Sequence, residues 1–143
     1  MQDMINDLEQ EFGGKIRWRT FSIWFAETGG VLRKYGAFLF LIDDVLHIRD
    51  YKHTKTIIGI KVKDKDEENY VRYDEQFPLS SIKRTFKVTR RKAARSVIQG
   101  QKVEKQSSLL ARIFRETVLA VETEEKQYFF EFPDKEFRKM VGK

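Results

Sequence analysis

The side chains that could do metal or acid–base chemistry are few in this chain. It has two histidines, His47 and His53, and no cysteine. Without cysteine, disulfides, thiolate nucleophiles and cysteine-ligated metal clusters are excluded. A metal such as zinc needs three or four ligands, and two histidines without a clear carboxylate partner do not supply them. We therefore expect one histidine on a strand face, one in a loop, no metal site and no cofactor.

Neither the paired acids nor the paired serines match a catalytic pattern. Asp43 and Asp44 are adjacent, so in a turn their side chains point apart. Ser80-Ser81 lacks the glycines of a nucleophile elbow. The glycines at 29, 30 and 36 fit neither the dinucleotide fingerprint nor a P-loop. We therefore expect a non-catalytic protein; an enzyme with an unrecognised site is the remaining alternative.

The positive charge is concentrated in one part of the chain. The 143 residues carry a net charge of +6 at pH 7. Residues 83–115 contain eleven Lys and Arg and one acid, Glu104, which gives +10 and leaves −4 for the rest. Such a surface attracts phosphates over about 8–10 Å in ordinary salt. The candidate anion-binding residues within this basic segment are Arg84, Lys87, Arg90, Arg91, Lys92 and Arg95.

These residues predict an interaction module that binds a protein partner or an anionic surface. Phosphate binding to nucleic acid through residues 83–115 is the alternative. It ranks lower because the basic segment holds only two aromatic residues, Phe86 and Phe114, and we expect both to face the core. The N-terminus lacks a secretory signal pattern, and the longest apolar run, 36–42, is far shorter than the about 20 residues that span a bilayer. We expect a cytoplasmic protein, peripheral at the membrane if the anionic surface is a lipid one.

Local patterns indicate the elements that carry these residues. Apolar residues at helical spacing predict a helix over 1–12, ended by Gly13-Gly14. Residues 15–25 read as a strand with a bend near Arg19-Thr20. Residues 36–42 and 45–51 predict a hairpin around Asp43-Asp44. Further strands are expected at 57–62, 77–82 and 85–88, with 70–73 pairing across a charged loop.

The basic segment allows two interpretations. Gly100 is its only glycine after Val88, so we expect a break there. Helical spacing of apolar residues precedes it, and Ser107 or Ser108 could cap a second helix after it; strands remain an alternative for both pieces. In a helix over 89–98, Arg91, Lys92 and Arg95 form a compact cationic surface. The apolar residues expected to face inward are Ala94, Val97 and Ile98 in the first helix, and Leu109, Leu110, Ile113 and Phe114 form the apolar stripe of the second.

The C-terminal part shows a hairpin and a helix. Residues 117–121 and 128–132 predict paired strands with a turn at 124–127. Tyr128, Phe130 and Phe132 should share one face of this hairpin. After Pro133-Asp134, helical spacing places Phe137, Met140 and Val141 on one stripe that packs on the core.

Several of these runs resemble a pleckstrin homology (PH)-like domain, including the bacterial PH-like type. Residues 32–51 (LRKYGAFLFLIDDVLHIRDY) are similar to its second and third strands, and 77–82 (FPLSSI) to a later strand. Residues 119–137 are similar to its last hairpin and C-terminal helix. The resemblance implies a mostly β fold, with two near-orthogonal antiparallel sheets forming a barrel and a C-terminal helix at one corner. It also implies a secondary anion site at Arg33 and Lys34.

The resemblance covers about residues 30–143 and has departures. No basic residue lies within 36–42, where phosphoinositide-binding members carry one, and the C-terminal helix is short and lacks its usual tryptophan. We expect a single domain over 1–143, made of a helix and linker at 1–14 and a PH-like barrel with its C-terminal helix at 15–143.

Overall fold

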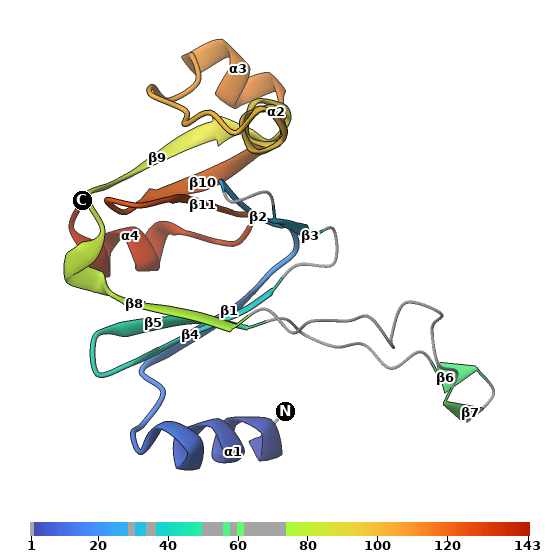
Figure 1. The fold of residues 1–143 in the computed structure, drawn as a ribbon, viewed down its shortest axis with the longest axis vertical. Coiled ribbons are helices and arrows are strands. Elements are labelled where there is room, and N and C mark those ends of the chain that lie inside the picture. Colours follow the sequence, from blue (N-terminus) through green and yellow to red (C-terminus); the bar gives the residue numbers. More distant parts are fainter. Residues whose placement is uncertain (1, 29–30, 34–36, 50–55, 58–59, 62–73) are drawn as a thin grey trace.

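Two antiparallel β-sheets form the centre of the molecule (Figure 1). The computed structural model describes residues 2–28, 31–33, 37–49, 56–57, 60–61 and 74–143. The first sheet has the order β1-β4-β5-β8, with β1 (Trp18–Ser22), β4 (Ala37–Ile42), β5 (Val45–Arg49) and β8 (Asp74–Pro78). The second has the order β3-β2-β11-β10-β9, with β3 (Val31–Arg33), β2 (Phe25–Glu27), β11 (Gln127–Phe130), β10 (Thr117–Glu122) and β9 (Arg84–Thr89). The mostly β class with two antiparallel sheets is thus confirmed, but no ladder among the described residues closes the sheets into a barrel.

The chain passes from the first sheet to the second between β1 and β2. The Ser22 hydroxyl donates to the Trp24 carbonyl (2.5 Å) and accepts from the Glu131 amide (3.0 Å). This bend lies at 22–24 and not near Arg19-Thr20, where the sequence placed it. The displacement has a packing reason, because Trp24 faces a different core cluster from Trp18 and Phe25.

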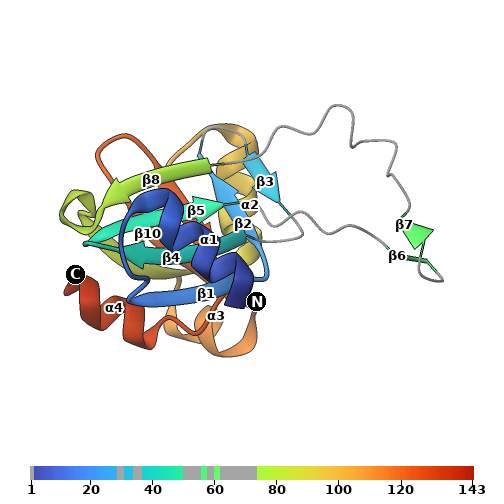
Figure 2. The same cartoon turned by 90° about the horizontal axis from the view of Figure 1, so that it is seen from below.

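The sheets separate the core into layers. The inner faces of both sheets enclose one cluster, which includes Leu39, Ile48, Leu119 and Phe130. Helix α1 (Gln2–Phe12) covers the outer face of the first sheet, where Leu8 packs with three strand residues. Helix α2 (Arg90–Gln99) covers the outer face of the second sheet. Figure 1 shows α1 and α2 at opposite ends of this stack, and in Figure 2, seen from below, α1 lies in front of the strands.

The geometry of the turn between β4 and β5 explains the presence of Asp43 and Asp44. Ile42 pairs with Val45, so Asp43 and Asp44 form a two-residue turn, both with positive φ (48° and 64°). Such turns match the twist of paired strands and need residues that tolerate the left-handed region, which Asp does better than most. The predicted hairpin is confirmed.

The region between β5 and β9 differs from the prediction. The expected strand at 57–62 is replaced by two short strands, β6 (Thr56–Ile57) and β7 (Ile60–Lys61), that pair with each other. The expected pairing of 70–73 lies outside the described residues. After β8, a 3-10 helix, η2 (Leu79–Ser81), leads to β9.

The C-terminal hairpin and helix follow the prediction. Val121 pairs with Tyr128 across the hairpin, and Tyr128, Phe130 and Phe132 belong to the same core cluster. In α4 (Lys135–Val141), Phe137 is 1% exposed. Its ring centre lies 5.3 Å from that of Trp18, which places α4 against the core between the sheets. None of the described helices is long and apolar enough to cross a membrane.

Candidate anion-binding surface

Helix α2 carries the centre of the basic segment. Thr89 caps it, accepting a hydrogen bond from the Lys92 amide (3.3 Å), and Gly100 ends it with φ of 68°. Ala93, Ser96 and Val97 form its buried face against the second sheet. The helical interpretation is therefore confirmed and the strand alternative is wrong for this piece. Ile98, expected to face inward, is instead 80% exposed, because its place three residues after Arg95 puts it on the exposed stripe.

A buried glutamine holds the chain that follows α2. Gln127 has no exposed surface. Its amide nitrogen donates to the Val103 carbonyl (2.6 Å), and its carbonyl accepts from the Val103 amide (2.8 Å). Further along, the Ser107 amide donates to the Lys87 carbonyl (3.0 Å), and the Ser107 hydroxyl accepts from the Thr89 amide (3.0 Å). Residues 101–107 are thereby held beside β9, one of the two edge strands of the second sheet.

Three of the six candidate residues are bound to acids of the protein itself. Arg84 pairs with Glu122 (3.1 Å) and Lys87 with Asp134 (2.9 Å). Arg90 pairs with Glu131 (3.1 Å) and also with Glu116. These pairs link β9 and the start of α2 to the C-terminal half, so they anchor the surface.

The pKa of Glu122 reflects its pairing with Arg84. Burial acts to raise this pKa, but hydrogen bonds from Arg84 and Gln127 outweigh it and lower the pKa below its usual range. Glu122 therefore stays ionised, and Arg84 is committed to it.

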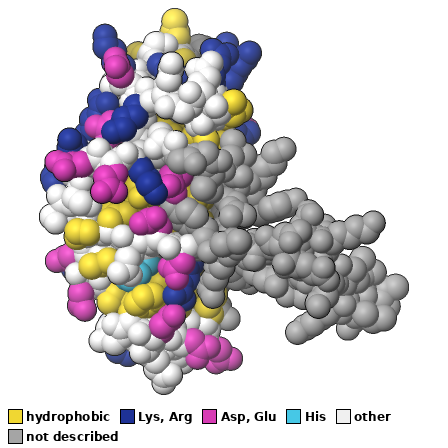
Figure 3. Space-filling model, in the orientation of Figure 1, with side chains coloured by type: hydrophobic (Ala, Val, Ile, Leu, Met, Phe, Trp, Pro, Cys, Tyr) yellow, Lys and Arg dark blue, Asp and Glu magenta, His cyan; other side chains and the backbone are white. Residues whose placement is uncertain are grey.

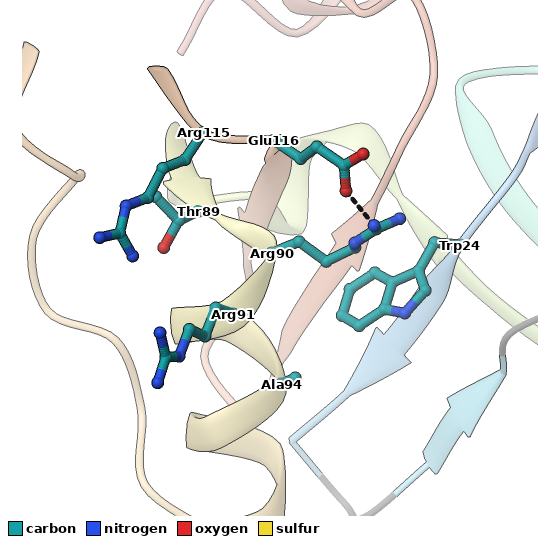
Figure 4. Close-up of a pocket in the computed structure, with 7 residues that line it drawn as sticks. All are labelled: Trp24, Thr89, Arg90, Arg91, Ala94, Arg115 and Glu116. Atoms are coloured by element: carbon teal, nitrogen blue, oxygen red, sulfur yellow. Dashed lines mark hydrogen bonds and ion pairs between the residues drawn. The ribbon is translucent and has the colours of Figure 1, made fainter. Parts of the chain in front are cut away.

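The other three candidates are free of such pairs. Arg91, Lys92 and Arg95 are exposed, and none forms an ion pair with an acid in the described part of the chain. Arg91 and Arg95 lie one helical turn apart. In Figure 4, Arg91 extends away from Trp24, whereas Arg90 turns toward Trp24 and Glu116.

Three shallow hollows join these cations to others in the basic segment. The largest, about 670 Å³, is lined by Arg90, Arg91 and Arg115 (Figure 4). Arg115 also lines a second of about 520 Å³, together with Lys92. Lys92 in turn lines a third of about 450 Å³. We call this continuous surface the cationic strip; it consists of Arg91, Lys92, Arg95, Lys102, Lys105 and Arg115.

Sequence reasoning did not assign Lys102, Lys105 and Arg115 to the site. They belong to the basic segment, but the attachment of residues 101–107 to Gln127 and β9 is what brings Lys102 and Lys105 beside α2. Arg115 lies at the end of α3, next to Glu116, whose carbonyl accepts from the Arg90 amide at the start of α2. Two acids also line the hollows: Glu104, and Glu116, which pairs with Arg90.

The remaining predicted positions are Arg33, Lys34, Phe86 and Phe114. Arg33 is the last residue of β3, but its side chain, like Lys34, lies outside what is described. Phe86 is buried, as expected, and lies under the Arg84 guanidinium (4.5 Å). The side chain of Phe114 is not among those described.

His47 lies in a packed environment on β5. It is buried between Phe12, whose ring centre is 4.3 Å away, and Phe40, which stacks on it at 4.7 Å. Burial, followed by the charge of Arg49, lowers its pKa below the usual value. His53 lies outside the described residues. No group of three or more metal-ligating side chains occurs in the described part of the chain.

Comparison of the chain with protein-family models, curated proteins and solved structures found no match. The surface at α2 has exposed cations, shallow relief and no enclosed cavity among the three hollows described above.

Proposed function

We propose that this chain is a non-catalytic binding module that associates with an anionic membrane surface through the cationic strip. The observation that carries the proposal is that Arg91, Lys92 and Arg95 are exposed together on α2, without an acid partner among the described residues. Each basic residue close to an anionic membrane contributes about 1 kcal/mol. Several together give weak, salt-sensitive association.

A PH-like fold is part of this proposal. Two features support it: β1–β2 and β3–β4 each run from one sheet to the other, and α4 packs Phe137 into the core between the sheets. A near-orthogonal arrangement of the two sheets would follow from such a fold. The strip is formed by the connection between β9 and β10. Its helix α2 contacts β3, the strand that ends at Arg33, which is one of the two positions that the resemblance implies.

The shallow shape of the strip favours a membrane surface over a specific small ligand. The hollows are open and their lining cations belong to long, exposed side chains. Such a surface attracts phosphates without selecting one headgroup. Nucleic acid is less favoured because the only aromatic side chain among the residues that line the three hollows is Trp24, which is buried, and single strands bind largely by base stacking.

Cosedimentation with vesicles tests the proposal. Vesicles of phosphatidylcholine with phosphatidylserine should pellet the wild type at low salt, and added salt should release it. The triple variant Arg91→Glu, Lys92→Glu and Arg95→Glu should bind about a hundredfold more weakly, from about 1 kcal/mol per residue. The matched control reverses three exposed basic residues outside the strip, Arg19, Lys135 and Lys139, and should retain most of the binding.

Two results would contradict the proposal. Equal loss in the strip variant and the control would mean that only net charge matters. A wild type that ignores anionic vesicles at low salt would remove the membrane function and make a protein partner the leading alternative. Tighter binding to duplex DNA than to vesicles in the same buffer would favour nucleic acid instead.

A further inference from the structure

Helix α3 (Leu109–Phe114) exposes three aliphatic side chains next to the cationic strip. Leu109, Leu110 and Ile113 are 64%, 68% and 63% exposed. In a helix these positions fall within one arc of about 100°, so they form a single apolar ridge. Figure 3 shows hydrophobic and basic side chains together at the end of the molecule where α2 and α3 lie.

The attachments of α3 keep the ridge outward. Ser108 caps the helix, accepting from the Ala111 amide (3.3 Å), and Ser107 is bonded to β9 on both its amide and its hydroxyl. Ala111 and Arg112 are half-buried, so they form the side of α3 that faces the protein. The ridge occupies the other side, and its exposure follows from how the helix is fixed.

Cations flank the ridge. Leu110 lines the same hollow as Lys92 and Arg115, and both of these cations are exposed. An apolar surface bordered by cations matches the boundary of an anionic bilayer, where acyl chains lie beneath phosphates. A second copy of this chain fits poorly, because the two basic segments, each +10 in the sequence, would repel one another.

We propose that Leu109, Leu110 and Ile113 insert into the acyl boundary of an anionic bilayer while the cationic strip contacts the lipid phosphates. The inference rests on the proposed membrane function and adds an orientation to it. Interfacial apolar surfaces of this kind enter the bilayer by about 5–10 Å. Helix α1, at the opposite end of the molecule (Figure 1), faces away from the membrane in this orientation.

A single environment-sensitive probe tests the insertion directly, because the chain has no cysteine of its own. The variant Leu110→Cys is labelled with the fluorophore NBD and mixed with phosphatidylserine-containing vesicles. Its emission should shift to shorter wavelength, and lipids brominated on their acyl chains should quench it. The matched control, Asn6→Cys on the exposed side of α1, should show neither change.

A variant without the ridge gives an independent readout. Leu109→Ser, Leu110→Ser and Ile113→Ser together should weaken vesicle binding at least about tenfold, since burying aliphatic surface drives the insertion. The residual binding should remain salt-sensitive, because the strip is intact. Circular dichroism at matched concentration checks that the variant is folded, as expected for exposed positions.

The outcomes separate this inference from the proposed function. If wild type does not bind anionic vesicles, the proposed function fails and the insertion fails with it. If wild type binds but the probe at position 110 stays in water, or the ridge variant binds like wild type, only the insertion is overturned. A blue shift at position 110 with no change at position 6 supports both.

Discussion

Helices α1 and α3 have similar apolar stripes and opposite environments. In α1, Leu8 is buried against Phe38, Phe40 and Ile42 on the first sheet. In α3, Leu110 and its neighbours face solvent. The helices also differ in charge, since α1 is rich in acids and α3 belongs to the basic segment. Helical spacing therefore identifies an apolar face but does not tell whether the protein itself covers that face.

The largest expected effect comes from truncating the same residue type in both helices. Leu8→Ala should lower the free energy of unfolding by about 2–4 kcal/mol, because it leaves a cavity between α1 and β4. Leu110→Ala should change it by less than about 0.5 kcal/mol, because the side chain is exposed. Urea denaturation measures both. Equal losses would mean that the ridge is packed in solution and that α3 is covered in the same way as α1.

A smaller effect is expected from the glutamine that holds residues 101–107. Gln127→Leu should lower the free energy of unfolding by about 1–3 kcal/mol, because it leaves the buried amide and carbonyl of Val103 without these hydrogen-bond partners. Trypsin should then cut faster after Lys102 and Lys105. The control Gln106→Leu, at an exposed position in the same segment, should change neither stability nor cleavage. Unchanged cleavage in Gln127→Leu would show that other contacts hold the segment.

The ion pair between Arg49 of β5 and Glu11 of α1 should contribute less to the free energy of unfolding. Arg49 donates to both carboxylate oxygens of Glu11 (2.7 and 2.9 Å), and this bonding raises the pKa of Arg49. Glu11→Gln should lower the free energy of unfolding by about 1 kcal/mol. The loss is small because Glu11 is partly exposed and because Arg49 still pairs with Asp74 in this variant. Asp7→Asn, on the exposed side of the same helix, serves as the control in the same denaturation series. A larger loss in Asp7→Asn than in Glu11→Gln would contradict this assignment.

The smallest expected effect is on the pH dependence of the free energy of unfolding. Burial and Arg49 lower the pKa of His47 in the folded state, while Asp74 and Glu11 act against them. The unfolded chain therefore takes up the proton first, so stability is full above about pH 6.5 and declines as the pH falls below it. In His47→Gln this part of the decline should disappear. Parallel pH profiles of stability for the two proteins would show that His47 does not contribute.

Local signals in the sequence were sufficient for the hairpins β4–β5 and β10–β11 and for the helices. Their turns, Asp43-Asp44 and residues 123–126, are contiguous with the strands they connect, so their effect is visible in a short window. The bend at 22–24 and the pairing of β6 with β7 depend on packing and on turn geometry. The bend was placed near Arg19-Thr20, and β6 and β7 were predicted as one strand at 57–62. Ile98 was predicted to face inward because its spacing is compatible with two faces of the helix. Only the position of the sheet determines which of the two faces is buried.

The sequence shows the positive charge of the candidate site but not which of its cations are paired with acids. Arg84, Lys87 and Arg90 were indistinguishable in sequence from Arg91, Lys92 and Arg95. Their acid partners, Glu122, Asp134 and Glu131, lie 38, 47 and 41 residues away. Which cations stay free is therefore decided by long-range contacts. Spacing along the chain cannot report these contacts.

The attachment of Ser107 to β9 has a consequence for self-association. An outermost strand with unpaired amides and carbonyls is a template for pairing with another chain, and proteins protect such edges by covering them. The Ser107 bonds occupy the Lys87 carbonyl and the Thr89 amide on this edge. The connection that presents the cations therefore also shields the sheet, and shortening it to reduce the basic charge would uncover a strand edge prone to aggregation.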